Sequence, residues 1–236
     1  MKILTWNCNG ALRKKYHKLV DIDADILIIQ ECENPIESKD ANYINWAGNY
    51  LWSGDSKNKG IGVFAKNDFK LKKLDWSNTF HDHTVKHFLP FSVNDKDSFL
   101  SVWTHQNNSP NFGYIGQLWK YIQINKDKIK NAIIVGDFNS NKIWDQWDRW
   151  WNHSDVVREL SEIGIESLYH KFTNEVQGEE TKPTFYLQRK IEKPYHIDFC
   201  FAPKRLSDKL INLEVGNYDD WKELSDHNPM IIEFEK

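Results

Sequence analysis

At the centre of the sequence stands the stretch IIVGDFNSN, residues 133–141. Its three apolar, mostly β-branched residues predict a buried strand, which Gly136 ends by letting the backbone turn. Asp137 and Asn139 then lie two residues apart, so extended geometry would point both side chains the same way. A carboxylate and an amide at the end of a buried strand can hold a hard cation beside an anionic oxygen. Taken alone, the stretch is explained equally well by a strand that ends in a turn with Asx caps.

Length and composition suit one α/β domain, which we expect to span residues 1–236. The 236 residues are 40% hydrophobic, enough for a sizeable core. No apolar run approaches a membrane span, and the start lacks a signal-peptide pattern, so no membrane partner is expected. The 3 cysteines are scattered without disulfide or zinc spacing, which indicates a reducing cytoplasm. At a net charge of −3, a polyanion would have to be held by a local patch or a metal.

Short apolar runs bounded by turn residues predict the strands of this domain. They lie at residues 3–6, 24–29, 60–65, 87–91, 99–102, 132–135, 183–186, 196–201, 210–215 and 230–234. Helical spacing predicts helices at 12–20, within 34–58, at 114–129 and, with Ser154 as N-cap, up to Ile163. The first elements suggest a β-α-β start. The runs at 60–65, 87–91 and 99–102 look like an antiparallel meander.

Tryptophan is unusually frequent, with 11 copies. Four of them, Trp144, Trp147, Trp150 and Trp151, follow the central stretch at near-helical spacing. Such residues can stack on nucleobases, but core packing explains most tryptophans. Packing is therefore the interpretation we favour for these four.

Polar side chains stand at the ends of the predicted strands. They are Asn7, Glu31, His105, Asp137, Asn139, Asp198, Asp226 and His227. In an open sheet such residues gather in one crevice. Taken singly, an acid such as Glu31 is more often a solvated loop residue, and a lone histidine such as His105 is usually structural.

The residue types in this set limit the chemistry. Carboxylates suit magnesium or manganese, and the absence of a histidine–cysteine cluster argues against zinc. Amides can donate to phosphate oxygens, and a histidine whose tautomer is fixed by an acid can serve as general base. The sequence contains neither a nucleophile elbow nor a P-loop. Metal-assisted attack of water on a phosphate ester is the reaction that these residues can perform.

The order of these motifs resembles the endonuclease/exonuclease/phosphatase superfamily. The matching stretches are Trp6-Asn7, Gln30-Glu31, Gly60-Ile61-Gly62-Val63, Thr104-His105, Gly136-Asp137-Phe138-Asn139, Ile197-Asp198 and Ser225-Asp226-His227. Each motif is weak alone, but together they follow the family's order and spacing, which makes the match strong. The resemblance implies an α/β fold, namely a four-layer α/β sandwich in which two mixed β-sheets pack together with helices on the outside.

The resemblance also implies which residues bind metal and phosphate. Glu31 would be the principal ligand of Mg²⁺ or Mn²⁺, and Asp226 would complete the metal shell directly or through water. Asn7 would steady the site and the phosphate, and Asn139 would bind the phosphate.

Catalytic roles follow from the same resemblance. Asp137 would position or deprotonate the attacking water. His227 would act as general base or transition-state stabiliser, oriented by Asp198. His105 would contact the phosphate or protonate the leaving oxygen.

Subfamily features are mixed. Abasic-site endonucleases commonly carry tyrosine at the position of His105, and histidine there is more similar to pancreatic-type deoxyribonucleases and sphingomyelinases. The stretch from Asn7 to Arg13 resembles the start of bacterial abasic-site exonucleases. The arginine-rich lead into Ile-Asp of those enzymes is replaced here by Lys193-Pro194-Tyr195-His196.

Hydrolysis of nucleic-acid phosphodiester bonds, with DNA favoured, is the predicted function. Arg13, Arg189 and Lys190 lie in loops near the predicted site and could contact the phosphate backbone. For the basic run at 13–15, however, a solvated helix face is the better explanation of the charges. An alternative is hydrolysis of a small phosphoester, such as a nucleotide, an inositol phosphate or a lipid headgroup. A third possibility is a non-catalytic binding domain, against which the intact acids argue.

Overall fold

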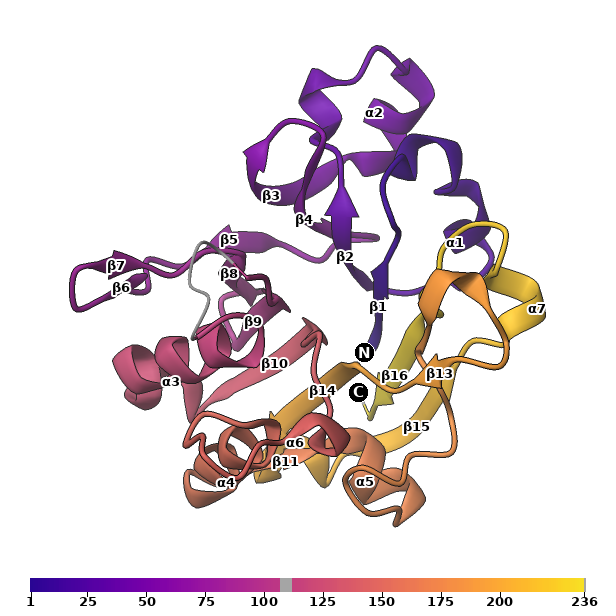
Figure 1. Ribbon diagram of the computed structural model, residues 1–236. Helices are drawn as coiled ribbons and strands as arrows, with labels where there is room; N and C mark the ends of the chain where they lie inside the picture. Colours follow the sequence, from indigo (N-terminus) through magenta and orange to yellow (C-terminus); the bar gives the residue numbers. More distant parts are fainter. Residues whose placement is uncertain (107–111, 236) are drawn as a thin grey trace.

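Two mixed β-sheets of 6 strands each lie face to face in this protein, whose computed structural model describes residues 1–106 and 112–235 (Figure 1). The first sheet has the strand order β15 (Leu210–Val215), β16 (Met230–Phe234), β1 (Lys2–Asn7), β2 (Ile26–Cys32), β4 (Lys59–Ala65) and β3 (Asn49–Ser56). The second has the order β11 (Ile165–Ser167), β14 (Asp198–Pro203), β10 (Ala132–Asp137), β9 (Asp97–Trp103), β8 (Phe88–Val93) and β5 (Leu71–Lys73). Two short ribbons pair β12 (Phe185–Tyr186) with β13 (Pro194–Tyr195) and β6 (Thr79–Phe80) with β7 (His83–Thr84).

Helices cover the outer face of each sheet and complete four layers. α3 (Ile115–Ile129) and α4 (His153–Glu162) pack on the second sheet. α1 (His17–Val20) and α2 (Ala41–Ala47) pack on the first. The other helices are short: α5 (Leu168–Thr173), α6 (Lys204–Ser207), α7 (Tyr218–Trp221), and the 3-10 turns η1 (Leu12–Lys14), η2 (Pro35–Glu37), η3 (Lys142–Trp144) and η4 (Leu187–Arg189). The predicted four-layer sandwich is confirmed.

The apolar runs of the central strands are explained by burial on both faces. In β2, Ile26 and Ile28 point into the core between the sheets, whereas Leu27 and Ile29 point to the helices. Both β2 and β10 have one parallel neighbour, β1 and β9 respectively, and antiparallel neighbours on the other side. Strands covered on both sides read as continuous hydrophobic runs, which is why the sequence indicated them clearly.

Gly136 lies inside β10, so the expectation that it ends the strand is wrong. Its φ is 141°, and a Cβ at this position would lie 2.0 Å from the carbonyl oxygen of Val102 on β9. No real side chain tolerates that approach, so the glycine permits close contact between the two parallel strands. The strand therefore continues to Asp137 and delivers its carboxylate at the sheet's end.

Two predicted helices differ in the structure. Residues 12–20 form the separate short turns η1 and α1, and Ala11 before them has a left-handed φ of 53°. α4 begins two residues earlier than expected, and its N-cap is Asn152 in a capping box with Asp155, not Ser154. The capping box satisfies two backbone donors reciprocally, which Ser154 could not do from inside the first turn.

The predicted antiparallel meander is right for the pair β8 and β9 but wrong for β4. β4 pairs with β2 and β3 in the first sheet, whereas β8 and β9 pair with each other in the second. The chain therefore crosses between the sheets after Ala65, at a point where the apolar pattern alone gives no signal of the change.

After the 3-10 turn η3, which ends at Trp144, the tryptophan-rich segment 144–151 forms no helix, and of its four tryptophans only Trp151, at 9% exposed, is buried. The side chains of Trp144, Trp147 and Trp150 are 43%, 96% and 62% exposed, so burial in the core does not explain them.

Across the described ranges of the chain, no helix has both the length and the apolar character needed to cross a lipid bilayer.

Candidate active site

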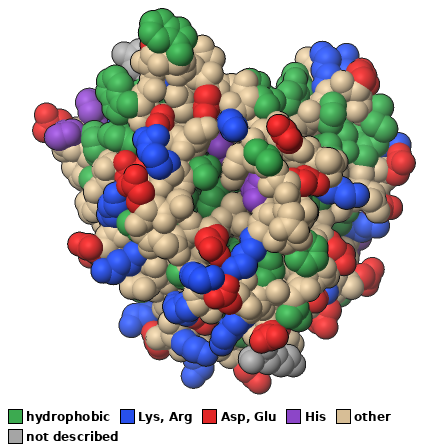
Figure 2. All heavy atoms as spheres, turned by 90° about the horizontal axis from the view of Figure 1, so that it is seen from below, with side chains coloured by type: hydrophobic (Ala, Val, Ile, Leu, Met, Phe, Trp, Pro, Cys, Tyr) green, Lys and Arg blue, Asp and Glu red, His purple; other side chains and the backbone are tan. Residues whose placement is uncertain are grey.

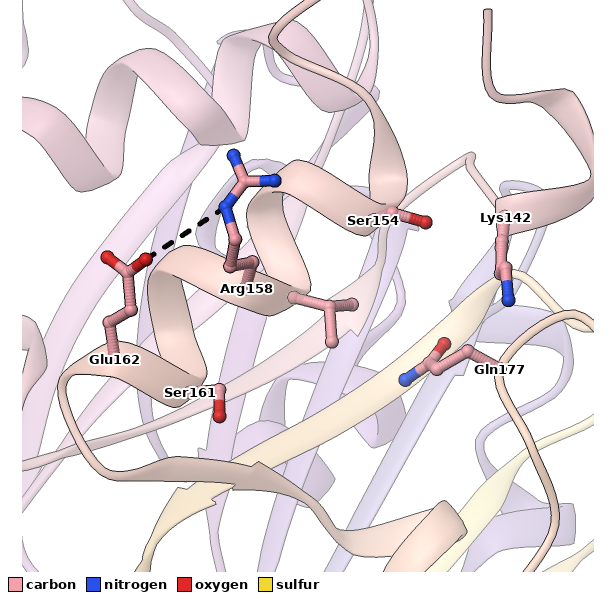
Figure 3. A pocket seen from close by; sticks show the side chains of 7 residues that line it. Lys142, Ser154, Arg158, Ser161, Glu162 and Gln177 are labelled. Atoms are coloured by element: carbon pink, nitrogen blue, oxygen red, sulfur yellow. Dashed lines mark ion pairs between the residues drawn. The ribbon is translucent and has the colours of Figure 1, made fainter.

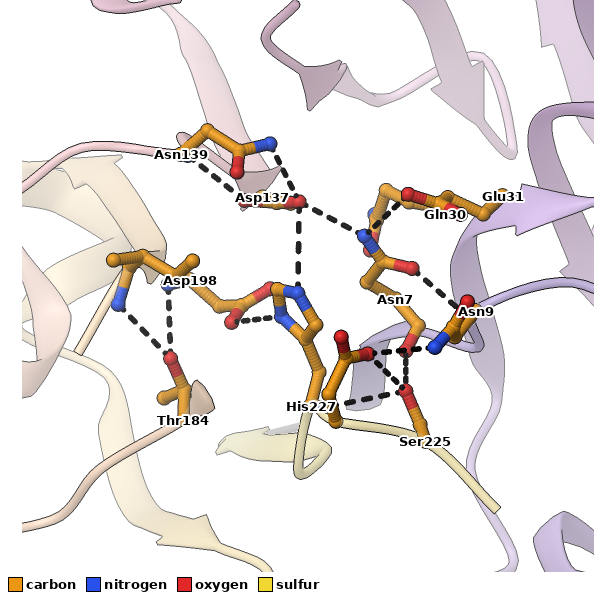
Figure 4. A network of polar contacts seen from close by, with 12 residues as sticks. Asn7, Asn9, Gln30, Glu31, Asp137, Asn139, Thr184, Asp198, Ser225 and His227 are labelled. Atoms are coloured by element: carbon orange, nitrogen blue, oxygen red, sulfur yellow. Dashed lines mark hydrogen bonds and ion pairs between the residues drawn. The ribbon is translucent and has the colours of Figure 1, made fainter. Parts of the chain in front are cut away.

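The polar residues predicted at strand ends meet at one end of the sandwich (Figure 4). Asn7 ends β1, Glu31 lies near the end of β2, and Asp137 ends β10. Asp198 begins β14 directly opposite Asp137 in the antiparallel register, and His227 comes from the loop before β16. Each sheet thus supplies part of the site, and the site depends on their packing.

Asn7 links the two sheets. Its side-chain amide donates to Oδ2 of Asp137 at 2.9 Å and to Oε1 of Glu31 at 3.3 Å. Its own oxygen accepts a hydrogen bond from the backbone N–H of Asn9 at 3.0 Å. Because Asn7 is only 2% exposed, these bonds fix its amide in one orientation.

Asn139 folds back onto Asp137 and does not continue the strand. Its φ is 44°, so the extended geometry expected from the sequence does not occur. Its backbone N–H donates to Oδ1 of Asp137 at 2.8 Å, and its side-chain amide donates to Oδ2 at 2.9 Å and to the carbonyl of Thr104 at 3.1 Å. The Asx-type cap that the sequence left as an alternative is therefore real, and it holds the candidate catalytic carboxylate.

His227 and Asp198 form the predicted pair. Nδ1 of His227 lies 2.8 Å from Oδ2 of Asp198, and Nε2 lies 4.0 Å from Oδ2 of Asp137. The hydroxyl of Thr184 accepts the backbone N–H of Asp198 at 3.0 Å, and the Phe185 ring lies 4.7 Å from the imidazole. With Nδ1 held by a carboxylate, Nε2 faces Asp137 and the reaction centre.

Burial and mutual charge set the protonation of this group. Burial raises the pKa of the Asp137 carboxyl above its ordinary value, even though His227 lies beside it and favours the charged form. Burial alone would lower the pKa of His227, but the carboxylates of Asp198 and Asp137 raise it. The imidazole is thereby favoured as a cation between two acids, and Asp137 gains affinity for a proton.

Glu31 reaches the site because β2 is irregular at its end. The pairing of β2 with β4 shifts register between Ile29 and Cys32, and Glu31 has a left-handed φ of 61°. Such bulges re-aim side chains next to active sites. The Glu31 carboxylate contacts the ammonium of Lys59, so a cation already pairs with it.

Asp226 lies beside these residues on the loop before β16. Its Oδ1 accepts a hydrogen bond from the side-chain amide of Asn9 at 3.0 Å. Ser225 donates its hydroxyl to the carbonyl of Asn7 at 2.7 Å and accepts the backbone N–H of His227 at 3.0 Å. The indole of Trp6 donates to the carbonyl of His227 at 2.9 Å. The loop is thus tied to β1 by hydrogen bonds.

The donor atoms suit a hard divalent cation. Glu31, Asp137 and Asp226 offer carboxylate oxygens, the ligands that Mg²⁺ and Mn²⁺ prefer. Asp137, Asp198 and His227 also place one ligand atom each within 4.8 Å of one another, all buried. The contact of Lys59 with Glu31 indicates which carboxylate is accessible to a cation, since Glu31 keeps 17% of its side chain exposed. We therefore expect Glu31 to be the first ligand.

The predicted peripheral residues differ in their surroundings. His105 follows Thr104, whose backbone N–H donates to the carbonyl of Asp137 at 2.9 Å, so it lies at the same end of the sandwich. Arg13 forms an ion pair with Glu33 at 3.0 Å. Arg189 donates to the backbone of residue 223 at 3.3 Å, and Lys190 is exposed. Arg189 lies close enough to Lys15 to disfavour its charge, although burial is the larger reason why the pKa of Lys15 is lowered.

Some residues of the site were missed from the sequence. Thr184 and Phe185 were placed in a strand, and Asn9 in a turn, without a functional role. Thr184 holds the backbone of Ile197 and Asp198 across 13 and 14 residues of chain. No local pattern signals such a contact. For Asn9, the sequence indicated only a turn, because asparagine is common in turns and Asn9 lies two residues after Asn7.

Two surface hollows lie near the α4 side of the second sheet. One, of about 400 Å³, is lined by Lys142, Arg158 and Gln177 among others and contains none of the predicted site residues (Figure 3). The other, of about 230 Å³, includes Asn139 and Ser140 in its lining and so adjoins the candidate active site.

The chain is similar to known proteins over nearly its whole length. A model of the endonuclease/exonuclease/phosphatase family matches residues 4–227. No curated protein sequence matches the chain. Among solved structures, a 3′ phosphatase, NExo, from Neisseria bound to a product DNA hairpin has a TM-score of 0.74 at 18% identity, with 100% of each chain covered.

Two further solved structures share the fold. An AP endonuclease from Archaeoglobus fulgidus has a TM-score of 0.69 at 17% identity, with 100% of each chain covered. The endonuclease domain of TRAS1, a telomere-specific non-LTR retrotransposon, has a TM-score of 0.67 at 16% identity, covering 99% of this chain and 97% of that one.

Proposed function

This chain belongs to the endonuclease/exonuclease/phosphatase family, and from that premise we propose that it is a divalent-metal-dependent phosphodiesterase that hydrolyses nucleic acid, with DNA favoured. The observation that carries the proposal is the buried hydrogen-bonded network of Asn7, Asp137, Asn139, Asp198 and His227. A purely structural domain would not hold three ionisable groups together at the open end of two sheets, because burial of charge is unfavourable without a compensating use.

Asp137 and His227 take complementary roles in this proposal. Asp137, whose pKa is raised by burial, is the better acceptor for a proton of the attacking water. His227, favoured as a cation by Asp198 and Asp137, stabilises the negative charge that develops on the phosphoryl oxygens. Asn139 and Asn7 position the phosphate and keep the Asp137 carboxylate from rotating.

The metal would be held by Glu31, with Asp226 completing its shell, and either Mg²⁺ or Mn²⁺ fits these oxygen donors. When bound, the cation supplies Lewis-acid polarisation of the phosphoryl oxygen. Lys59 contacts Glu31 in this structure, so its ammonium and a bound cation would compete for the same carboxylate.

DNA as substrate is supported by the nature of the similar structures, one of which is bound to a DNA hairpin. Arg13, Arg189 and Lys190 are proposed to contact phosphates away from the cleaved bond. Arg13 is the weakest of the three candidates, because its guanidinium already forms an ion pair with Glu33. The 3 cysteines are free, buried thiols, which suits the proposed cytoplasmic location.

A small phosphoester is the second candidate substrate. The net charge is −3, and Figure 2 shows Lys and Arg side chains interspersed with Asp and Glu over the face seen from below in Figure 1. A mixed surface without a continuous basic patch on that face favours a compact ligand mildly, because long-range attraction of a polyanion is weak.

One assay tests both candidates. The protein is incubated with plasmid DNA, single-stranded DNA, a duplex with an abasic site and a generic phosphomonoester, each with Mg²⁺ and with excess chelator. Metal-dependent cleavage of a DNA substrate is the expected result. Turnover of the phosphomonoester alone would replace the nuclease proposal with the phosphatase alternative.

A further inference from the structure

A groove adjoins the candidate active site. It is the hollow of about 230 Å³ that Asn139 and Ser140 line together with Tyr114, Trp144 and Arg149. Asn139 is the proposed phosphate-binding residue. A substrate whose cleaved phosphate lies at Asn139 would therefore place its neighbouring nucleotides in this groove.

Exposed aromatic rings border the groove. Trp144 and Tyr114, which line it, are 43% and 46% exposed, and Trp147 and Trp150 in the same segment are 96% and 62% exposed. Leaving an aromatic side chain in water forgoes roughly 1.5–3 kcal/mol of burial free energy. Several such residues within one short segment are therefore best explained by a ligand that covers them.

The segment that carries these tryptophans is held in one conformation. The side-chain amide of Asn152 donates to the carbonyls of Gln146 and Arg149 at 2.8 and 3.0 Å, and its oxygen accepts the N–H of Gln146 at 2.9 Å. Asp145 accepts the backbone N–H of His153 at 2.9 Å at the start of α4. A fixed platform loses little conformational entropy when a ligand binds.

Aromatic rings also connect Trp144 to the catalytic histidine. The Trp144 ring lies 5.1 Å from that of Tyr195, Tyr195 lies 6.3 Å from Phe185, and Phe185 lies 4.7 Å from His227. Trp144, which lines the groove, is thus the far end of a row of ring contacts that begins at His227.

From these observations we propose that the groove beside Trp144 binds the unpaired bases of a nucleic acid next to the cleaved phosphate, so that the substrate has a single-stranded segment there. The inference rests on the proposed nuclease function and names its substrate class. Aromatic faces stack on bases of any sequence, but only on bases that are not already stacked inside a duplex. The Arg149 guanidinium, 4.8 Å from the Trp151 ring, adds a cation for the backbone.

The positive and negative charges of the tryptophan-rich segment balance, so a nucleic acid would bind there by base stacking more than by electrostatic attraction. Lys142 and Arg149 are balanced by Asp145 and Asp148. Exposed tryptophans also occur at membrane surfaces. Here the groove adjoins the candidate active site at Asn139 and contains the Arg149 guanidinium as well as rings, which suits a nucleic acid whose cleaved phosphate lies in that site better than a lipid surface.

Binding of paired oligonucleotides tests the proposal. One probe is a fluorescently labelled oligothymidylate, and the other has the same length and phosphate charge but abasic sugars. Ca²⁺ replaces Mg²⁺ to slow cleavage, and anisotropy gives the dissociation constants. We expect the base-bearing probe to bind the full chain more tightly, and Trp144→Ala to remove roughly 5- to 100-fold of that affinity while leaving the abasic probe's affinity unchanged.

Matched variants sharpen the experiment. Trp144→Phe keeps a ring and should recover most of the affinity. Phe172→Ala removes a ring that is 43% exposed, as Trp144 is, but lies on α5 outside the groove, and it should leave both affinities unchanged. Equal loss in Trp144→Ala and Phe172→Ala would overturn the inference, because it would show a general effect of surface hydrophobicity.

The remaining outcomes separate this inference from the proposed function. If the wild-type chain cleaves DNA but binds both probes equally, the stacking groove is wrong and the nuclease proposal stands. If it neither binds nor cleaves any oligonucleotide, the nucleic-acid function fails and the inference fails with it. A tryptophan fluorescence change on mixed phosphatidylcholine–phosphatidylserine vesicles, without one on oligonucleotide, would assign the segment to membranes and also overturn it.

Discussion

Asn139 shows how much of this site is decided by single residues. Its backbone N–H and its side-chain amide both donate to Asp137, while the same side chain is the proposed phosphate ligand. The sequence allowed either an Asx cap or a functional amide here, and the structure contains the cap. Sequence order predicted the convergence of Asp137, Asp198 and His227. Sequence order could not predict that the Thr184 hydroxyl accepts a hydrogen bond from the backbone N–H of Ile197, 13 residues away. A threonine that binds distant backbone leaves no pattern in the neighbouring sequence.

Glu31 is expected to control metal binding. Replacing it with glutamine keeps the shape but removes the charge that attracts the cation, so Glu31→Gln should abolish most activity and weaken Mn²⁺ binding at least tenfold. Calorimetric titration of Mn²⁺ measures the second effect without turnover. Glu37→Gln, on the exposed turn η2, is the control and should behave as wild type. Unchanged Mn²⁺ affinity in Glu31→Gln would rule out this ligand.

His227 is expected to act in the chemical step. His227→Ala should lower kcat by about two to four powers of ten with a much smaller change in KM. Asp198→Asn should have a milder effect of the same kind, since the ring loses the carboxylate that orients it at 2.8 Å. The double variant should be little worse than His227→Ala. Losses that multiply would show that the two residues act independently.

Strands and turns carry these residues to their positions, and the irregular points matter most. The bulge at the end of β2 re-aims Glu31, and the close contact of β10 with β9 needs Gly136. The apolar runs predicted the strands because both faces are buried. They could not predict which sheet each strand joins, so β4 was wrongly grouped with β8 and β9.

Gly136→Ala should be strongly destabilising. The added Cβ would meet the Val102 carbonyl at 2.0 Å in a backbone conformation unfavourable to other residues, which should cost about 3 kcal/mol or more of unfolding free energy. Gly164→Ala is the matched control, because its φ is also positive at 77° but nothing lies within 4 Å of its Cβ. It should cost only about 1–2 kcal/mol. Urea unfolding of both variants makes the comparison, and equal losses would refute the steric argument.

At the scale of the whole molecule, stability should depend on pH through buried histidines beneath the site. His153 is 1% exposed, and its Nδ1 has no hydrogen-bond partner in the described parts of the chain. Burial lowers its pKa to about 4. Burial lowers the pKa of His196 as well. Both rings must therefore gain a proton on unfolding whenever the pH lies below the ordinary histidine value.

The contribution of His153 to stability should decrease as the pH falls. Because the folded pKa of His153 lies below an unfolded value of about 6.5, its contribution is complete above that pH and is lost as the pH falls toward 4. The loss should reach on the order of 3 kcal/mol at the acid end. The raised pKa of the buried Asp137 carboxyl stabilises the fold as the pH falls over the same range, so the contribution of His153 has to be read from the difference between wild type and variant. Urea unfolding between about pH 7 and pH 4.5 should show the wild type losing stability relative to His153→Phe.

His81→Gln, in the exposed β6–β7 turn, is the control for this prediction and should leave the pH profile unchanged. A stability difference between wild type and His153→Phe that stays constant from about pH 7 to about pH 4.5 would contradict the neutral, buried state of His153.

Overall charge bears on the substrate. With a net charge of −3, binding of DNA has to come from local contacts such as Arg189 and Lys190. Replacing both with alanine should flatten the dependence of binding on salt by up to about one unit of log–log slope per lost contact. Lys72→Ala with Lys73→Ala, on edge strand β5, is the matched control. An unchanged slope in the Arg189 and Lys190 variant would exclude this loop as a phosphate contact.

The pairing of β1 with β16 has a consequence for biosynthesis. The loop with Ser225 and His227 is bonded to Asn7 and Trp6, so residues translated first meet residues translated more than 200 positions later. A nascent chain whose C-terminal part is still inside the ribosome lacks both the strand that borders β1 and the catalytic imidazole. Contacts this distant in sequence form late in folding. The proposed active site therefore cannot form on a nascent chain until β16 and the loop before it have left the ribosome, and the proposed activity would begin only after that point.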